Sequence, residues 1–155
     1  MTQPLALAAE DIRTDLATRG AKIKWVVVVD ESLPPGLIAN AAVCMAISVG
    51  KTIPQLVGPS GADASGQVHA GLPWTGCSVL SADRATIHDI RKRAAARPGI
   101  HLVDMAEQAQ TSRVYDDYLQ ALAETSGDDL SYYGISLVGP RNAVDKLVGR
   151  LPLLR

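Results

Sequence analysis

The chain has 155 residues, of which 47% are hydrophobic and 20% charged, a composition typical of one globular domain and unlike that of a disordered protein. Fifteen basic and sixteen acidic residues give a formal net charge of -1, which does not support nucleic-acid binding through overall charge. The two cysteines form no CxxC pair, the start lacks a basic segment before an apolar run, and no apolar stretch reaches membrane-spanning length. We therefore expect a cytoplasmic protein with no membrane segment.

The first third of the chain predicts a helix, a buried strand and a second helix. Apolar residues at helical spacing over residues 5–18 predict an amphipathic helix within an N-terminal helical extension, residues 1–21. Residues 22–30 read KIKWVVVVD, a β-branched run typical of a central strand covered on both faces. Two prolines end this strand. The alanine-rich run over residues 37–49 then predicts a helix buried around nearly its whole circumference.

The rest of the chain continues to alternate strands with helices. Strands are predicted at residues 55–57, around Val68, and at residues 77–80, 100–104 and 133–138. Helices are predicted between Ser81, as the cap, and Pro98, over residues 114–122, and from Pro140 onward. This alternation predicts a single α/β domain over residues 22–155, in which helices cover both faces of a parallel or mixed sheet.

Polar residues near the predicted strand ends are the candidate site. In open α/β sheets, ligands bind at the carboxyl ends of the strands. This rule selects Asp30 and Glu31 after the first strand, together with Asp104 and the turn at Gly139. The alternative for Asp30 is that it only satisfies backbone groups of its own loop. Asn40, nearly the only polar side chain of its helix, needs a partner that is either a ligand or a neighbouring strand.

Other motifs give no support to a phosphate loop, a metal site or a cofactor. Residues 50–52 read Gly-Lys-Thr, but position 45 is a methionine where a phosphate loop needs glycine, and the tripeptide closes a helix. The three histidines lie at no recognised metal-ligand spacing. The basic run at residues 91–93 lies on a helix with acidic neighbours, which favours a solvated face.

Three stretches carry a resemblance to a known family. They are KIKWVVVVDESLPPGLIANAA at residues 22–42, the region of Asp104, and YYGISLVGPRNAVDKLVGRLPLLR at residues 132–155. In these residues the chain resembles the bacterial "domain of unknown function two thousand" family, related in fold to the type II peptidyl-tRNA hydrolases. The resemblance implies a three-layer α/β/α fold with a mixed, mostly parallel sheet, and a homodimer.

The hydrolases' motifs match this chain only in part. Their first helix opens with Gly-Lys and continues to Gln, whereas here Gly36 is followed by Leu37 and the Gln position holds Asn40. Asp104 matches their later Asp, while Gln108 stands where they have Thr. The resemblance thus implies Asp104 as catalytic residue and Gly36, Asn40 and Gln108 as part of a ligand site, without the lysine that would stabilise an anion.

Three functions follow as hypotheses. The first is an uncharacterised protein that binds a small ligand in a strand-end pocket formed by Asp30, Asn40 and Asp104. The second is a divergent peptidyl-tRNA hydrolase-like esterase in which Asp104 orients water. The third is a non-catalytic dimeric interaction module.

Overall fold

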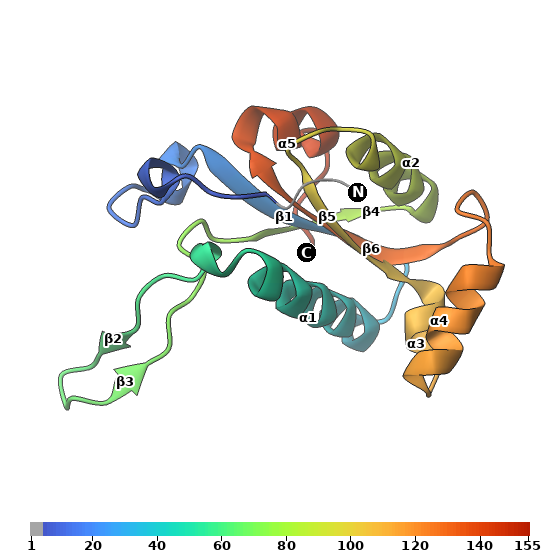
Figure 1. Cartoon of the computed structure of the whole chain (residues 1–155), viewed down its shortest axis with the longest axis horizontal. Helices are drawn as coiled ribbons and strands as arrows, with labels where there is room; N and C mark the ends of the chain where they lie inside the picture. The colour runs from blue at the N-terminus through green and yellow to red at the C-terminus, as the bar shows by residue number, and fades with distance from the viewer. Residues whose placement is uncertain (1–4) are drawn as a thin grey trace.

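The computed structural model describes residues 5–155 and shows a mixed α/β fold (Figure 1). The main strands are β1 (Ile23–Asp30), β4 (Ser78–Ala82), β5 (His101–Ala106) and β6 (Tyr132–Pro140), and a small hairpin contains β2 (Gly61–Ala62) and β3 (Val68–His69). The α-helices are α1 (Pro35–Thr52), α2 (Arg84–Ala95), α3 (Glu107–Thr111), α4 (Tyr115–Glu124) and α5 (Arg141–Val148). Short 3-10 helices are η1 (Ala9–Asp11), η2 (Thr18–Gly20) and η3 (Pro54–Leu56).

The four main strands form one sheet in the order β4-β1-β6-β5. β1 pairs with β4 in parallel, whereas β6 is antiparallel to both β1 and β5. The prediction of a mixed sheet is therefore confirmed. The prediction of mostly parallel pairing is wrong, because β6 lies between β1 and β5 and runs against both of them.

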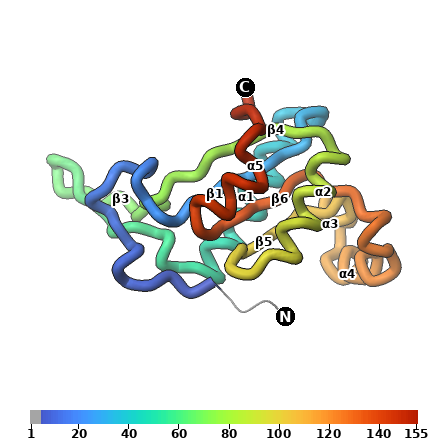
Figure 2. Tube along the Cα trace, turned by 90° about the horizontal axis from the view of Figure 1, so that it is seen from above, coloured from blue at the N-terminus to red at the C-terminus, as the bar shows by residue number. Residues whose placement is uncertain are grey.

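Helices lie on both faces of the sheet. Along β1, Val27 and Val29 belong to the core that packs under α1, while Val26 and Val28 belong to the core under α2 and α5. These four valines are at most 2% exposed, which confirms the predicted central strand. Figures 1 and 2 show α1 on one side of the sheet, α2 and α5 on the other, and α3 and α4 beyond the end of β5.

Several local predictions are wrong for identifiable reasons. Residues 5–18 form no amphipathic helix, because Leu5 and Leu7 pack against the α1-side core from an extended segment with only two short 3-10 turns nearby. The residues before Leu5 in the predicted extension lie outside the described residues. No strand forms at residues 55–57, since Pro54 starts the 3-10 turn η3 through Leu56 and Val57 makes only an isolated bridge with Pro73.

The second helix begins later than predicted, and its cap is a different residue. Asp83 caps α2 by accepting a hydrogen bond from the Thr86 amide at 2.7 Å, while the predicted cap, Ser81, lies within β4. α3 was not predicted from the sequence, because it has only five residues and follows β5 without a break. The remaining predicted helices and strands occur close to their expected positions.

The helix α1 is less buried than its composition predicts. Its buried residues are Ala41, Met45 and Val49, which face the sheet. On the outward face Val43 is 68% exposed and Ile47 is 76% exposed. The prediction of burial around nearly the whole circumference is therefore wrong within the described chain, because one helical layer alone covers this face of the sheet.

A hairpin, here called the arm (residues 57–73), leaves the body after η3. Its base is closed by pairing of Val57 with Pro73, and β2 and β3 pair near its tip. At the tip, the Asp63 carboxylate accepts hydrogen bonds from the amides of Ser65 and Gln67. Figures 1 and 2 show the arm standing away from the rest of the molecule.

Candidate functional site

Asp30, the last residue of β1, is a buried structural anion. Its side chain is 1% exposed and points to the α2 face. One oxygen accepts hydrogen bonds from the Ser32 amide and hydroxyl at 2.9 and 2.6 Å, and the other accepts from Arg84 Nε at 2.6 Å. Burial by itself raises the pKa of Asp30, but the hydrogen bonds from Ser32 and Arg84 outweigh burial and hold the pKa below its ordinary value.

Arg84, at the start of α2, neutralises this carboxylate and joins several elements. Its guanidinium donates a hydrogen bond to Ser131 Oγ at 3.3 Å, lies 3.6 Å from Glu107, and stands 5.6 Å from the Tyr133 ring centre. Both oxygens of Asp30 are therefore occupied, one by Ser32 in the loop after β1 and the other by Arg84 of α2, which in turn contacts Ser131 before β6. The alternative prediction, that Asp30 satisfies only groups of its own loop, accounts for the bonds from Ser32 but not for the bond from Arg84.

The other predicted residues around this corner have different surroundings. Glu31 is exposed and lines a hollow of about 470 Å³ beside the C-terminal segment. Gly36 is exposed at the start of α1, with open space where a Cβ would lie. Gly139 lies at the opposite end of the sheet from Asp30, because β6 runs antiparallel and its carboxyl end pairs with Lys24 near the start of β1.

Gly139 has a packing role. A Cβ at this position would lie 2.7 Å from Ile100 Cδ1 and 2.8 Å from the Gly99 carbonyl oxygen, closer than atoms pack. The strand-end argument that selected Gly139 assumed a parallel strand, so the prediction that it lies on the same rim as Asp30 is wrong.

Asp104, on β5, repeats the pattern of Asp30. One of its oxygens accepts a hydrogen bond from Arg91 Nε at 3.0 Å, and Arg91 stands 5.5 Å from the Tyr132 ring centre. Side chains alternate along a strand, so Asp30 and Asp104 lie on the same face of the sheet as Val28 and Leu102, the face covered by α2. Asn40 is exposed on α1, which covers the opposite face of the sheet. The prediction that these three residues form one pocket is wrong.

A different pocket, here called the β5-edge pocket, lies where β5 forms the edge of the sheet. It has a volume of about 500 Å³ and opens between α1, β5 and the α3–α4 connection. Asp104 is the one residue of the predicted set that lines it. The lining residues are Cys44, Met45, Ser48, Val103, Asp104, Met105, Ala109, Ser112, Arg113, Val114, Tyr115 and Tyr118.

Two predicted residues lie next to this pocket. The Cys44 thiol, which lines the pocket, is 3.8 Å from the Asn40 side-chain oxygen. Gln108 precedes the lining residue Ala109 in α3, and its Oε1 is buried with no hydrogen-bond partner among residues 5–155. Buried polar atoms normally have a hydrogen-bond partner. The Gln108 oxygen is therefore free to accept a hydrogen bond from water or from a ligand.

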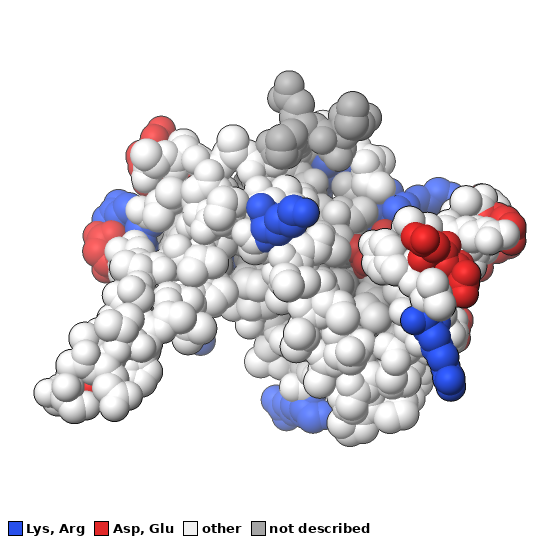
Figure 3. All heavy atoms as spheres, turned by 60° about the horizontal axis from the view of Figure 1, so that its bottom comes forward, with Lys and Arg blue, Asp and Glu red and all other residues white. Residues whose placement is uncertain are grey.

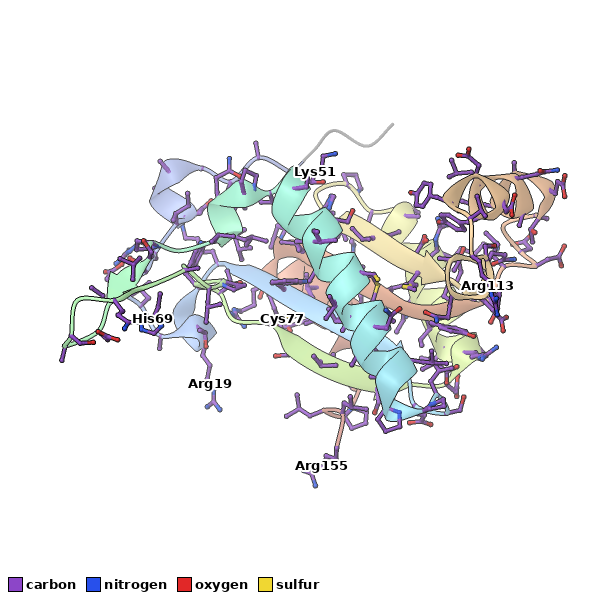
Figure 4. All side chains as sticks on the ribbon, turned by 90° about the horizontal axis from the view of Figure 1, so that it is seen from below. Arg19, Lys51, His69, Cys77, Arg113 and Arg155 are labelled. Atoms are coloured by element: carbon purple, nitrogen blue, oxygen red, sulfur yellow. The ribbon has the colours of Figure 1, made fainter. Side chains whose placement is uncertain are left out.

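The polar groups of the β5-edge pocket are suited to an anion with an apolar body. Arg113 is exposed and makes no ion pair with any described residue, and Figure 4 shows it at the α3–α4 connection. It lines the pocket together with Cys44 and Ser48 of α1. The rings of Tyr115 and Tyr118 meet edge to face with centres 5.4 Å apart. Burial, with smaller effects from Asp104 and Tyr115, raises the pKa of Tyr118, so its phenol stays protonated and can donate a hydrogen bond.

The spacing of Arg84 and Arg91 in the sequence is a signal for their shared role that the predicted site does not include. Arg84 and Arg91 are seven residues apart, which places them two turns apart on one face of α2. That face looks toward the ends of β1 and β5, where the two aspartates lie. Arg113, Tyr115 and Tyr118 gave no comparable signal, because α3 was not predicted and the pocket depends on how the chain turns after β5.

Within the described chain, no group of three or more His, Cys, Asp or Glu side chains is placed to hold a metal ion. No described helix is both long enough and apolar enough to cross a membrane. Both cysteines are free and exposed.

Comparison with known proteins identifies a family and a fold. No curated protein matches the chain. A solved structure of a protein of unknown function, Atu0240 from Agrobacterium tumefaciens strain C58, superposes with a TM-score of 0.80 at 19% identity, covering 86% of this chain and 98% of that chain. The profile of a family described as "Protein of unknown function (DUF2000)" matches residues 23–155. The chain belongs to the DUF2000 family.

Proposed function

We propose that the protein binds a small anionic molecule with an apolar or aromatic body in the β5-edge pocket. The observation that carries this proposal is an arginine, Arg113, that has no ion-pair partner among residues 5–155 and lies beside two tyrosines and an apolar floor. Ligand pockets combine a mostly apolar lining with a few polar groups that fix orientation. The volume of about 500 Å³ lies within the range usual for small-molecule sites.

The polar groups suggest how a ligand would be oriented. A carboxylate or phosphate would pair with the Arg113 guanidinium, which offers a planar set of donors. The apolar body would pack between Val103, Met105 and the tyrosine rings. The second Asp104 oxygen, Oδ1, has no hydrogen bond to a described residue, so it would accept from a hydroxyl or amine of the ligand.

A matched pair of probes tests the proposal. Calorimetric titration would compare phenyl phosphate and phenylacetate with the uncharged phenylacetamide, using the whole chain. We expect the anions to bind at least tenfold more tightly than the amide, because a charge-assisted contact is worth roughly 1.5–3 kcal/mol.

Two variants test whether the anions bind in the β5-edge pocket. We expect Arg113→Gln to remove the preference for anions, whereas Arg150→Gln, on the far side of the sheet beside α5, leaves it unchanged. Absence of binding by every probe, or equal anion binding by both variants, would count against the proposal.

The finer fold assignment, a three-layer type II peptidyl-tRNA hydrolase-like fold, is part of this proposal. It is supported by the mixed four-stranded sheet with helices on both faces. The hydrolase-like esterase is the second candidate, because Asp104 Oδ1 is free to orient a water molecule in the pocket.

The esterase has a weaker structural basis than the binding protein. Among the described residues, neither the Cys44 thiol nor the hydroxyls of Ser48 and Ser112 make a hydrogen bond to a histidine or carboxylate, so no nucleophile is activated. A turnover assay with peptidyl-tRNA would separate the two functions. Hydrolysis by the wild type that is lost in Asp104→Asn would establish the esterase.

A further inference from the structure

The helix α1 has the composition of a buried element but lies on the surface. It has 18 residues, and Lys51 is its sole charged side chain. Nevertheless Val43 and Ile47 on its outward face are 68% and 76% exposed. Helices that are apolar all round are normally covered on every side, so an exposed face of this kind marks an interaction surface.

The arm adds to this surface. Residues 59–70 are all exposed, and Val68 and Leu72 are 74% and 76% exposed. The arm keeps its shape through its own hydrogen bonds, among them those accepted by Asp63 at the tip. Figure 1 shows that it projects on the α1 side of the sheet, and Figure 3 shows few charged side chains over the arm and the neighbouring face.

We propose that the outward face of α1 and the arm form a twofold symmetric interface with a second copy of this chain. In an antiparallel pairing of two α1 helices centred on Val43, Ile47 lies opposite the partner's Ala39, and Gly50 lies opposite the partner's Gly36. Ile47 then packs against a small side chain, Val43 meets its own copy at the centre, and the glycines leave room at the ends, so the helix axes can lie about 8–10 Å apart. Such self-complementarity is what a twofold interface requires.

The charges at the two ends of α1 fit the same arrangement. Lys51 stands at the carboxyl end, and Glu31 precedes the amino end; both are exposed and neither forms an ion pair with a described residue. Antiparallel pairing brings each lysine toward the end of the partner helix that carries the partner's Glu31. Opposite charges then meet twice, once at each end of the interface.

The arm is needed because a stable dimer buries more surface than α1 alone can offer. A specific interface buries about 800 Å² on each partner. An 18-residue helix is about 27 Å long, and one face of it is too narrow to supply that area alone. Val68 and Leu72 on the arm, which follows α1 through η3, supply further exposed apolar surface. A membrane surface fits less well, because membrane-binding helices are rich in lysine and arginine and α1 has one lysine.

Sedimentation equilibrium of the whole chain tests the interface. We expect a dimer for the wild type, and a dissociation constant at least about 30-fold higher for Val43→Asp and Ile47→Asp, since each buries a charge at the centre of the contact. Leu72→Asp on the arm should weaken the dimer less. Leu119→Asp, at an exposed leucine of α4, is the matched control and should not change it. Circular dichroism and thermal melts check that every variant folds.

Disulfide trapping tests the geometry separately. In a Cys44→Ser/Cys77→Ser background, Val43→Cys lies on the proposed twofold axis and should give a covalent dimer on mild oxidation, whereas Leu119→Cys should not. A monomeric wild type at about 100 μM, a dimer unaffected by Ile47→Asp, or a dimer that Val43→Cys does not trap would each overturn the proposal. Flotation of a monomer with phosphatidylserine vesicles would assign the surface to a membrane instead.

Discussion

The two faces of the sheet use their charged residues in different ways. On the α2 face, Asp30 and Asp104 are each paired with an arginine of the same helix, and each arginine lies over a tyrosine. At the edge beside α1, Arg113 has no ion-pair partner within the described chain and lines an open pocket. The Asp30 carboxylate is thus part of the scaffold. The groups free to bind a ligand are Arg113, on the connection between two helices, and the second oxygen of Asp104, and both residues line the β5-edge pocket.

Removal of the Asp30 carboxylate should have the largest effect on stability. Asp30→Ala leaves the Ser32 groups and the Arg84 guanidinium without their shared acceptor, and we expect the free energy of unfolding to fall by about 2–3 kcal/mol. Urea denaturation measures this change. Asp89→Ala, which removes an exposed carboxylate of α2, is the control and should change stability by less than about 0.5 kcal/mol. Equal effects would contradict a structural role for Asp30.

Gly139→Ala should have the next largest effect. The added methyl group would overlap Ile100 and the Gly99 carbonyl, and overpacking of this kind costs about 1–3 kcal/mol. Thermal denaturation would show a lower midpoint, while Gly20→Ala, where nothing lies within 4 Å of the new Cβ, should show little change. If Gly139→Ala leaves stability intact but alters ligand binding, Gly139 belongs to a site after all.

Breaking the second aspartate-arginine pair should have a smaller effect. Arg91 and Asp104 retain 35% and 23% of their side-chain exposure, so solvent compensates for part of the lost contact. We expect Arg91→Met to lower the free energy of unfolding by about 1 kcal/mol in the same urea assay. A loss as large as that of Asp30→Ala would show that the two pairs are energetically equivalent.

The pH dependence of stability should give the smallest effect. The pKa of Asp30 is lower in the folded protein than its ordinary value near 3.9, so the unfolded chain binds more protons in acid. The stabilisation by Asp30 is present above about pH 4 and is lost as pH falls through the folded pKa. The wild type should therefore lose more stability between about pH 5 and 2 than Asp30→Asn does. Parallel curves for the two proteins would refute this contribution.

The four main strands and the longer helices were predictable from local patterns, and the site was not. The valine run of β1 and the prolines before α1 predicted a buried strand followed by a helix, because a β-branched run and a proline break are local signals. The direction of β6 depends on long-range pairing, which has no local signal. Because β6 was expected to run parallel to β1, Gly139 was predicted at the wrong end of the sheet. Tertiary contacts of Leu5 and Leu7 likewise override the helical spacing of the first residues.

The exposure of α1 and the β5-edge pocket depend on what the rest of the chain leaves uncovered. A sequence that is apolar around a whole helix predicts burial, but it does not say which chain supplies the cover. The pocket forms because β5 is an edge strand and the chain turns through α3 into α4, and neither feature has a local signature.

Nuclear magnetic resonance titration with phenyl phosphate tests most directly whether the edge pocket, and not the Asp30 corner, is the binding site. We expect saturable shifts of backbone amides at residues 103–105 and 112–118, no change at Ser32 or Arg84, and loss of these shifts in Arg113→Gln. Saturable shifts centred on Ser32 and Arg84, with residues 112–118 unchanged, would contradict it.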